Sequence, residues 1–224
     1  THCISSAASD VYKRQGDTSS SQKGFIISIT AIGEANADQI VRRSTAQKGD
    51  LICCSGDLGG AYIGLLFLER EKKIYLESPG VQPDLENETY VIGRLLKPKA
   101  RKNVHELLAE KSVLPTSMMD ISDGLSSELL HICEKSAVGC VIYEEKLPIS
   151  EDTRKAAYKF EIDPTACALS GGEDYELLFT IKQEDYEKLT LVEKISVIGY
   201  VTDAEDGAKI KTKGGNTYNI TAQG

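Results

Sequence analysis

The sequence predicts an α+β domain. Short apolar runs rich in β-branched residues predict strands, and longer stretches with apolar residues at every third or fourth position predict helices. The two kinds of element follow one another without strict alternation, which favours an α+β domain over a doubly wound parallel sheet. The chain has 224 residues and is 41% hydrophobic, so it can bury a sizeable core.

The first half of the chain contains two predicted strands and three predicted helices. Residues 24–35, GFIISITAIGEA, form an apolar, β-branched run bounded by glycines, and residues 48–56 form another that begins at a Gly-Asp turn. At 57–73 the apolar spacing changes to a helical period that ends in charged residues. Two further helices are expected at 84–96 and 101–111, with a proline turn between them.

The second half begins with a short strand at 117–122 and a helix at 123–137. Helical spacing places Leu125, Leu129, Ile132 and Cys133 on the buried face of that helix and Ser126, Ser127 and Glu128 on its outer face. The remaining predicted strands are 139–149, 175–181, 195–201 and 208–214, and the remaining helices are 150–160 and 183–189.

The two ends of the chain look unlike the rest. Residues 1–15 lack an initiator methionine and any hydrophobic periodicity. Their last part, SSAASDVYKRQ, resembles translated sequencing-adapter sequence, so we expect a non-native segment here; the alternative is a natural basic arm. The far end, NTYNITAQG, stops after a strand-like run. We therefore expect a fragment of a longer protein.

Charge and cysteine content exclude several classes of protein. The formal net charge of −8 argues against a nucleic-acid partner, because phosphate backbones require a basic surface. An acidic protein can still bind phosphorylated small molecules when metal ions neutralise both sides. No run of about 18 apolar residues is present to span a membrane. The six cysteines show no metal-binding spacing, which predicts buried free thiols in a reducing cytoplasm.

Two aspartates and a serine lie together in SMMDISDGLSSELL, residues 117–130. Helix capping would explain Ser122 or Asp123, but it leaves Asp120 at the end of the preceding strand unexplained. Oxygen ligands at a strand-to-helix turn suit Mg²⁺, which takes one or two carboxylates and shares its shell with phosphate. From residue types alone, a metal site and a capped helix both remain open.

A second acidic motif is ALSGGEDYELLF, residues 168–179. Its paired glycines permit a sharp turn that leads to the adjacent acids Glu173 and Asp174. Adjacent side chains point in different directions, so we expect only one of the two carboxylates to face a site. A simple turn before a strand explains the same residues.

Other polar groups give weaker signals. The glycine-rich loop 55–61 lacks the Lys-Ser/Thr of a P-loop and the GxGxxG spacing, so close helix packing competes with phosphate binding there. Solvated surface positions are expected for the basic group Lys97, Lys99, Arg101 and Lys102, and for the pair Arg42 and Arg43. The histidines form no triad, and no serine or cysteine has the context of a nucleophile.

Three segments in order resemble thiamine-monophosphate kinase: GDT at 16–18, MDISDGLSSEL at 119–129 and ALSGGEDYELLFT at 168–180. That enzyme belongs to the superfamily of aminoimidazole-ribonucleotide synthetase and selenophosphate synthetase. The resemblance implies a three-layer PurM-like C-terminal domain with a mixed sheet. It also implies transfer of the ATP γ-phosphoryl group to thiamine monophosphate, with Mg²⁺ and no covalent intermediate, by a protein that forms a homodimer.

The resemblance also assigns roles to individual residues. By position in the shared motifs, the implied magnesium ligands are Asp17, Asp120 and Asp123. The implied contacts to ATP are Gly16, Asp17, Arg43 and Ser122. Glu173 matches a residue that contacts the thiamine moiety.

The departures from the family pattern concern the ends. Residues 16–35 match a remnant of the N-terminal ATP-binding domain, including one strand, and residues 36–224 match the C-terminal domain. Most of the family's metal-binding aspartates would precede Gly16, and its terminal aromatic substrate contact would follow Gly224. We therefore expect this chain alone to have little or no kinase activity. The alternatives are another enzyme of the superfamily, such as selenophosphate synthetase, and a non-catalytic module that binds a nucleotide or a partner.

Overall fold

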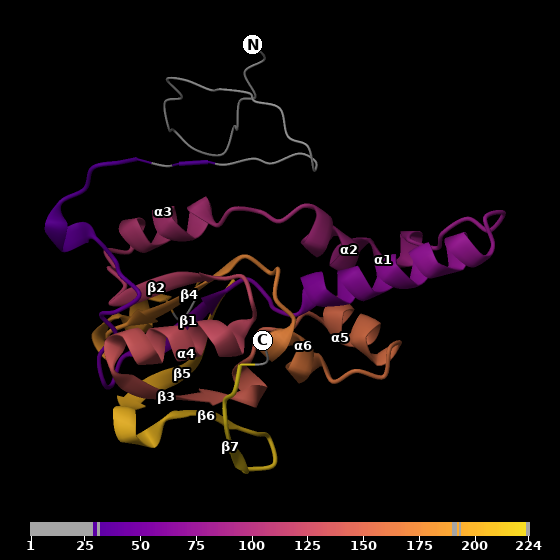
Figure 1. The fold of residues 1–224 in the computed structure, drawn as a ribbon. Coiled ribbons are helices and arrows are strands. Elements are labelled where there is room, and N and C mark those ends of the chain that lie inside the picture. The colour runs from indigo at the N-terminus through magenta and orange to yellow at the C-terminus, as the bar shows by residue number, and fades with distance from the viewer. Residues whose placement is uncertain (1–28, 31, 190–191, 193, 223–224) are drawn as a thin grey trace. The chain divides into compact units, whose positions relative to one another are not determined.

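The computed structural model describes residues 29–30, 32–189, 192 and 194–222. Its contacts divide the chain into two units, residues 1–40 and residues 41–224. The second unit contains the sheet and all the α-helices that the structure describes (Figure 1). The described part of the first unit contains only a 3₁₀ turn, Ala37–Gln39.

A seven-stranded mixed sheet forms the centre of the second unit, in the order β2-β4-β1-β5-β3-β6-β7. The strands are β1 Leu51–Ser55, β2 Ser117–Ile121, β3 Val138–Tyr143, β4 Glu176–Ile181, β5 Ile195–Asp203, β6 Ala208–Lys211 and β7 Thr217–Asn219. β3 and β6 run parallel, and the other neighbours run antiparallel. Every strand predicted at or beyond residue 48 is present.

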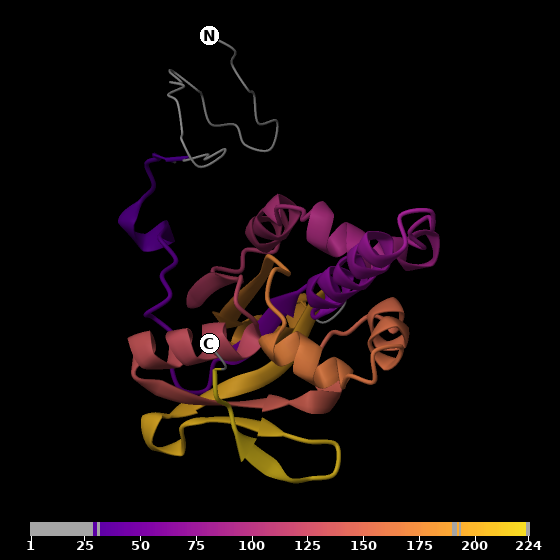
Figure 2. The ribbon, with the colours of Figure 1, turned by 45° about the vertical axis from the view of Figure 1, so that its right-hand side comes forward.

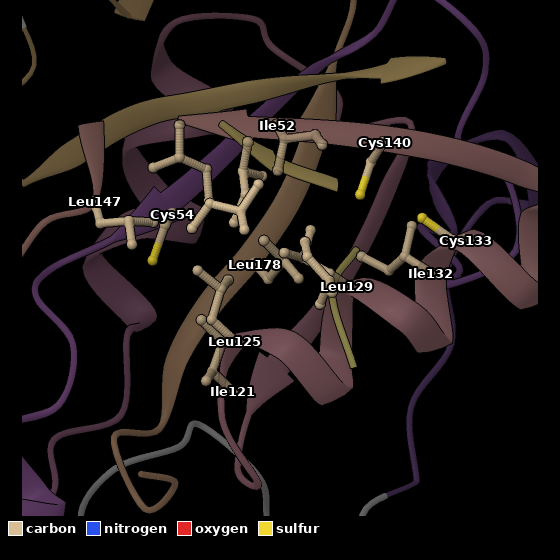
Figure 3. Close-up of a cluster of buried hydrophobic side chains, with 14 of the residues drawn as sticks. Ile52, Cys54, Ile121, Leu125, Leu129, Ile132, Cys133, Cys140, Leu147 and Leu178 are labelled. Atoms are coloured by element: carbon tan, nitrogen blue, oxygen red, sulfur yellow. The ribbon is translucent and has the colours of Figure 1, made fainter. Parts of the chain in front are cut away.

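Helices cover both faces of this sheet. They are α1 Gly60–Glu77, α2 Thr89–Leu96, α3 Lys102–Glu110, α4 Leu125–Ser136, α5 Glu151–Tyr158, α6 Pro164–Ser170 and α7 Tyr186–Leu189. Adjacent residues of β1 show the layering, because successive strand side chains point to opposite faces. Cys54 packs with Leu125 and Leu129 of α4 (Figure 3), whereas Cys53 packs with Val104 and Leu108 of α3. The domain therefore has three layers, as the resemblance implied.

A third hydrophobic cluster joins four helices beside the sheet. Ile63 and Phe67 of α1 pack with Val91 of α2, Ala156 of α5 and Cys167 of α6. Figures 1 and 2 show these four helices together at one end of the sheet. The cluster fixes the positions of the N-terminus of α1 and of α6, whose C-terminal end leads into one of the loops described below.

Several boundaries differ from the sequence prediction. The strand expected at 139–149 ends at Tyr143, where a 3₁₀ turn begins. The strand expected at 24–35 is absent from its described residues, 29–30 and 32–35, and residues 24–28 and 31 lie outside the described part. Ile29 and Ile32 are 82% and 88% exposed and no strand in the described part of the chain pairs with them, so within that part their backbone groups gain no partner from an extended conformation.

The helix α6 was not predicted. It begins at Pro164, after Asp163, whose side chain accepts a hydrogen bond from the backbone N–H of Thr165 at 2.9 Å. An aspartate cap followed by proline at the first helical position is a usual start signal. The signal was present in the sequence, but the helix is short and carries too few periodic apolar residues to stand out.

The described cysteines are free and buried, as predicted. Burial raises the pKa of Cys53 to about 12, so its thiol stays protonated and unreactive at neutral pH. Among the described helices, none combines the length and the apolar character needed to cross a bilayer.

Candidate functional site

Two loops meet at one edge of the sheet. Residues 122–124 connect β2 to α4, and residues 171–175 connect α6 to β4. Because β2 and β4 are antiparallel neighbours, with Ile121 opposite Glu176, the end of one strand lies beside the start of the other. The backbone N–H of Glu173 donates to the carbonyl of Ser122 at 2.7 Å, and that of Tyr175 donates to the carbonyl of Ile121 at 2.9 Å. The structure thus joins the two acidic motifs.

Glycines allow these loops to approach so closely. Gly124 has φ +120° and Gly172 has φ +68°, values that side chains other than glycine rarely adopt. A Cβ at Gly124 would lie 2.7 Å from the carbonyl oxygen of Leu169, and a Cβ at Gly172 would lie 2.8 Å from that of Ser122. Gly172 is therefore required by the contact between the loops, and Gly124 by the contact of its loop with the end of α6.

Four polar side chains gather where the loops meet. Asp120, Asp123 and Glu173 are exposed, and Tyr175 is 40% exposed. The pKa of Tyr175 is raised, first by its hydrogen bond to Glu173 and the negative charge of that carboxylate, then by burial and by the charges of Asp120 and Asp123. All three carboxylates therefore act on one phenol, and their combined charge favours a cationic ligand.

The donor set at this point fits a magnesium ion that is shared with phosphate. Among the residues that the structure describes, no three His, Cys, Asp or Glu side chains converge as a closed metal site. Asp120 and Asp123 offer two carboxylates, and Ser122, between them, is half-buried. One or two protein carboxylates are what Mg²⁺ usually takes when phosphate oxygens and water complete its shell.

A buried acid, Glu128, stabilises the turn between β2 and α4. Glu128 was predicted on the outer face of its helix, and so was Ser126, but they are only 1% and 4% exposed. One carboxylate oxygen of Glu128, Oε1, accepts a hydrogen bond from the backbone N–H of Asp123 at 3.2 Å. Helical spacing missed this contact because the side chain reaches back to the residues before the helix. Burial raises the pKa of Glu128.

Exposed and buried side chains alternate along residues 173–176, at the end of the loop between α6 and β4. Glu173 and Tyr175 face outward, whereas Asp174 and Glu176 are 2% and 0% exposed. This confirms that only one of the adjacent acids, Glu173, is available to a ligand. Both Glu173 and Tyr175 have left-handed backbones, with φ +61° and +50°, an arrangement that costs about 1–3 kcal/mol per residue.

Asp174 occupies the N-terminus of α1. Its Oδ2 accepts from the backbone N–H of Gly59 at 2.6 Å, and its Oδ1 accepts from that of Ala61 at 3.3 Å. A helix N-terminus attracts anions, and here a carboxylate of the same chain takes that position. A Cβ at Gly59 would lie 2.9 Å from the backbone nitrogen of Ala168. Close packing thus explains the glycine-rich loop 55–61, and the N–H groups of Gly59 and Ala61 already have a carboxylate acceptor.

We expect Asp174 to make stability depend on pH. Burial raises the pKa of Asp174 to about 6 from 3.8, so the folded protein binds a proton more tightly than the unfolded chain. The resulting stabilisation is present below pH 4 and is lost as pH rises through about 6. Between pH 4.5 and 7, Asp174→Asn should gain about 2 kcal/mol in free energy of unfolding relative to wild type. Urea unfolding at several pH values measures this, and a constant difference would contradict it.

Glu176 binds two arginines and a serine. Its Oε2 accepts from Ser55 Oγ and from Arg101 Nε, both at 2.6 Å. Its Oε1 pairs with Arg94 Nη1 at 3.0 Å and also with Arg101 Nη2. Arg101 was predicted to be solvated, but its side chain is only 17% exposed. This prediction was wrong because a surface-like run of basic residues does not reveal a buried partner 75 residues away.

The other predicted residues lie in different places. Arg43 is exposed. The segment that carries it runs beside β2, because the carbonyl of Arg42 accepts from the backbone N–H of Met118 at 3.2 Å. Gly16 and Asp17 lie outside the described residues. The remaining basic residues of the second group are exposed as predicted: Lys97, Lys99 and Lys102.

A family model decides the classification of this chain. The family described as AIR synthase related protein, C-terminal domain, matches residues 47–211. The chain belongs to this family. The matched range contains the sheet from β1 to β6 and both acidic loops, so the family fold accounts for the three layers.

Curated relatives show which members of this family the chain resembles. A thiamine-monophosphate kinase of Pyrococcus abyssi is 37% identical over 206 residues, which cover 91% of this chain and 58% of the relative. The thiamine-monophosphate kinase of Aquifex aeolicus is 34% identical over 203 residues, or 89% of this chain and 60% of the relative. The chain thus spans a little more than half the length of these relatives. The resemblance of its motifs to thiamine-monophosphate kinases is confirmed.

Solved structures agree with this family. AaThiL in complex with AMPPCP and TMP has a TM-score of 0.61 at 32% identity, over 76% of this chain and 50% of that one. The thiamine monophosphate kinase of Stenotrophomonas maltophilia has a TM-score of 0.64 at 29% identity, over 84% and 56%. The hydrogenase maturation protein HypE in complex with ATP shares the fold, with a TM-score of 0.63 at 20% identity, over 86% and 56%.

Proposed function

We propose that this chain supplies the C-terminal domain for transfer of the ATP γ-phosphoryl group to thiamine monophosphate, giving thiamine diphosphate and ADP. The observation that carries this proposal is the pairing of the two loops, in which the N–H of Glu173 bonds to the carbonyl of Ser122. The pairing brings acids suited to a metal ion beside an acid suited to a cationic ring. The relatives named thiamine-monophosphate kinase support the same reaction.

In this proposal each described site residue has one role. Asp120 and Asp123 hold magnesium, which would neutralise charge on the phosphates as the phosphoryl group moves. Ser122 and Arg43 contact the nucleotide phosphates. Glu173 lies at the positively charged ring of thiamine monophosphate. Catalysis then rests on positioning and charge neutralisation, and no side chain forms a covalent bond with phosphate.

The wider arrangement belongs to the same proposal. Residues 36–224 form the C-terminal domain, and residues 16–35, with Gly16 at ATP and Asp17 at magnesium, belong to a preceding ATP-binding domain. The complete enzyme would be a cytoplasmic homodimer. A net charge of −8 argues against nucleic acid or an anionic membrane surface as the partner, and it is compatible with small phosphorylated ligands when metal ions neutralise the charge.

The direct test is a phosphoryl-transfer assay. Residues 36–224 are fused behind the N-terminal half of the Aquifex aeolicus relative, and ADP release from Mg·ATP is measured with and without thiamine monophosphate. We expect release that depends on thiamine monophosphate from the fusion and little or none from the chain alone. A folded, dimeric fusion without this activity would contradict the proposal, and activity with selenide instead would favour the selenophosphate synthetase alternative.

Removal of the Glu173 carboxylate should affect one substrate more than the other. In the fusion, Glu173→Ala is expected to raise the KM for thiamine monophosphate about tenfold, because the ring loses a charge-assisted partner, while the KM for ATP changes less. Steady-state kinetics with each substrate varied in turn measure both constants. Glu187→Ala, at another exposed glutamate, serves as the control. A larger effect on ATP than on thiamine monophosphate would show that the assignment is wrong.

A further inference from the structure

Arg94 of α2 contacts the buried side of the loop formed by residues 171–175. Its Nη2 donates to the backbone carbonyl of Asp174 at 3.2 Å and to that of Asp57 at 2.9 Å. The same guanidinium lies 3.0 Å from Oε1 of Glu176 and 3.6 Å from Oδ1 of Asp174. The Arg94 side chain is 11% exposed, so these contacts form in a largely dry environment, where charged hydrogen bonds are strong.

The backbone segment that Arg94 binds determines the directions of the exposed side chains of Glu173 and Tyr175. Asp174 stands between Glu173 and Tyr175, and both neighbours have left-handed φ values. Residues in this region stay there only when their surroundings fix them. The hydrogen bonds to Ser122 and Ile121 fix the loop on its outer side. On the inner side it is held by Arg94 and by the carboxylate of Asp174 at the N-terminus of α1.

We propose that Arg94 is a positioning residue, which sets the direction of Glu173 by binding the carbonyl of Asp174 in the middle of the left-handed segment. The hydrogen bonds and ion pairs of Arg94 in the described structure are with Asp57, Asp174 and Glu176, and not with the exposed carboxylates. The effect of Arg94 on substrate is therefore indirect, and the part that concerns thiamine monophosphate rests on the proposed function of Glu173.

Arg101 provides the matched comparison. It binds the same carboxylate, that of Glu176, through Nε at 2.6 Å and through Nη2. In contrast to Arg94, its hydrogen bonds in the described structure reach the Glu176 side chain and not the backbone of residues 173–175. Substitution of either arginine weakens the buried ion network, but only Arg94 should change the loop.

The first experiment measures the loop without any substrate. Arg94→Lys and Arg101→Lys keep the positive charge but lose the planar fork that makes several contacts at once. Amide hydrogen exchange is followed by mass spectrometry in the peptide that covers residues 172–176. We expect exchange in Arg94→Lys to be about tenfold faster than in wild type at the same pH, and exchange in Arg101→Lys to remain close to wild type.

The second experiment measures binding of thiamine monophosphate to the fused enzyme by calorimetry, with Mg²⁺ present. Arg94→Lys should raise Kd about tenfold, but should add no further loss in a Glu173→Ala background, because both changes act through one carboxylate. Arg94→Met, with circular dichroism as the check on folding, gives a stronger version of the same comparison.

The possible results test the positioning role of Arg94 separately from the proposed function. Equal exchange rates in the two lysine variants would overturn the positioning role, whatever binds. Additive losses in the double variant would also overturn it, since Arg94 would then act independently of Glu173. Faster exchange in Arg94→Lys, together with a folded wild-type fusion that binds no thiamine monophosphate, would support the positioning role and would count against the proposed function instead.

Discussion

Glu176→Ala is expected to lower the free energy of unfolding by about 3–5 kcal/mol, the usual cost of removing one partner from a buried ion pair. Glu176 is fully buried and balances the positive charges of Arg94 and Arg101. Without its carboxylate both guanidinium groups would remain partly desolvated, and the Ser55 hydroxyl would lose its acceptor. Urea unfolding followed by far-UV circular dichroism measures the change.

The control for this experiment is Glu184→Ala. The side chain of Glu184 is 74% exposed and pairs with Lys182 at 3.5 Å. Exposed pairs of this kind contribute between 0 and about 1 kcal/mol. A loss below about 1 kcal/mol for Glu176→Ala, or equal losses for the two variants, would mean that the network is not important for stability.

Asp120→Asn should reduce turnover of the fused enzyme about 100-fold while the fold stays intact. Loss of a metal ligand weakens Mg²⁺ binding at the point where charge develops on the phosphates. Because Asp120 is exposed, the substitution leaves no unpaired buried group, and the free energy of unfolding should change by less than about 0.5 kcal/mol. Initial rates over a Mg²⁺ titration measure the effect.

Saturating Mg²⁺ should restore part of the lost rate. Asp152→Asn, at an exposed acid in the first turn of α5, controls for the loss of one negative charge elsewhere on the domain and should behave like wild type. Unchanged rates for Asp120→Asn at limiting Mg²⁺ would refute its role as a ligand.

The elements that sequence predicts best are those with a strong local signal. β1 and α1 were expected because apolar spacing changes from continuous to helical within a few residues. The short helix α6 lacks such a run. The strand expected at 139–149 was predicted too long from composition alone, because the strand in the structure ends at Tyr143. Strand order could not be predicted either, since β2 pairs with β4 although residues 122–175 separate them in the chain, from Ile121 opposite Glu176 to Ser117 opposite Thr180.

The same difference between local signals and distant partners applies to the residues of the candidate site. Asp120, Ser122, Asp123 and Glu173 could be proposed from the sequence because each belongs to a compact motif that carries the family resemblance. Arg94, Arg101 and Glu128 were missed because their importance depends on distant or buried partners. Tyr175 was not predicted as a site residue, although it lies in the second acidic motif. An exposed aromatic residue between two acids, directly before a strand, is a signal that could have indicated it.

The central claim is that the carboxylates at the β2–α4 turn hold divalent cations against nucleotide phosphates. Anomalous X-ray diffraction from crystals of the fused enzyme, grown with Mn²⁺, a non-hydrolysable ATP analogue and thiamine monophosphate, tests it most directly. We predict manganese peaks within about 2.2 Å of carboxylate oxygens of Asp120 and Asp123, with analogue phosphate oxygens in the same coordination shells. Occupied nucleotide with both carboxylates free of metal at saturating Mn²⁺ would contradict the claim.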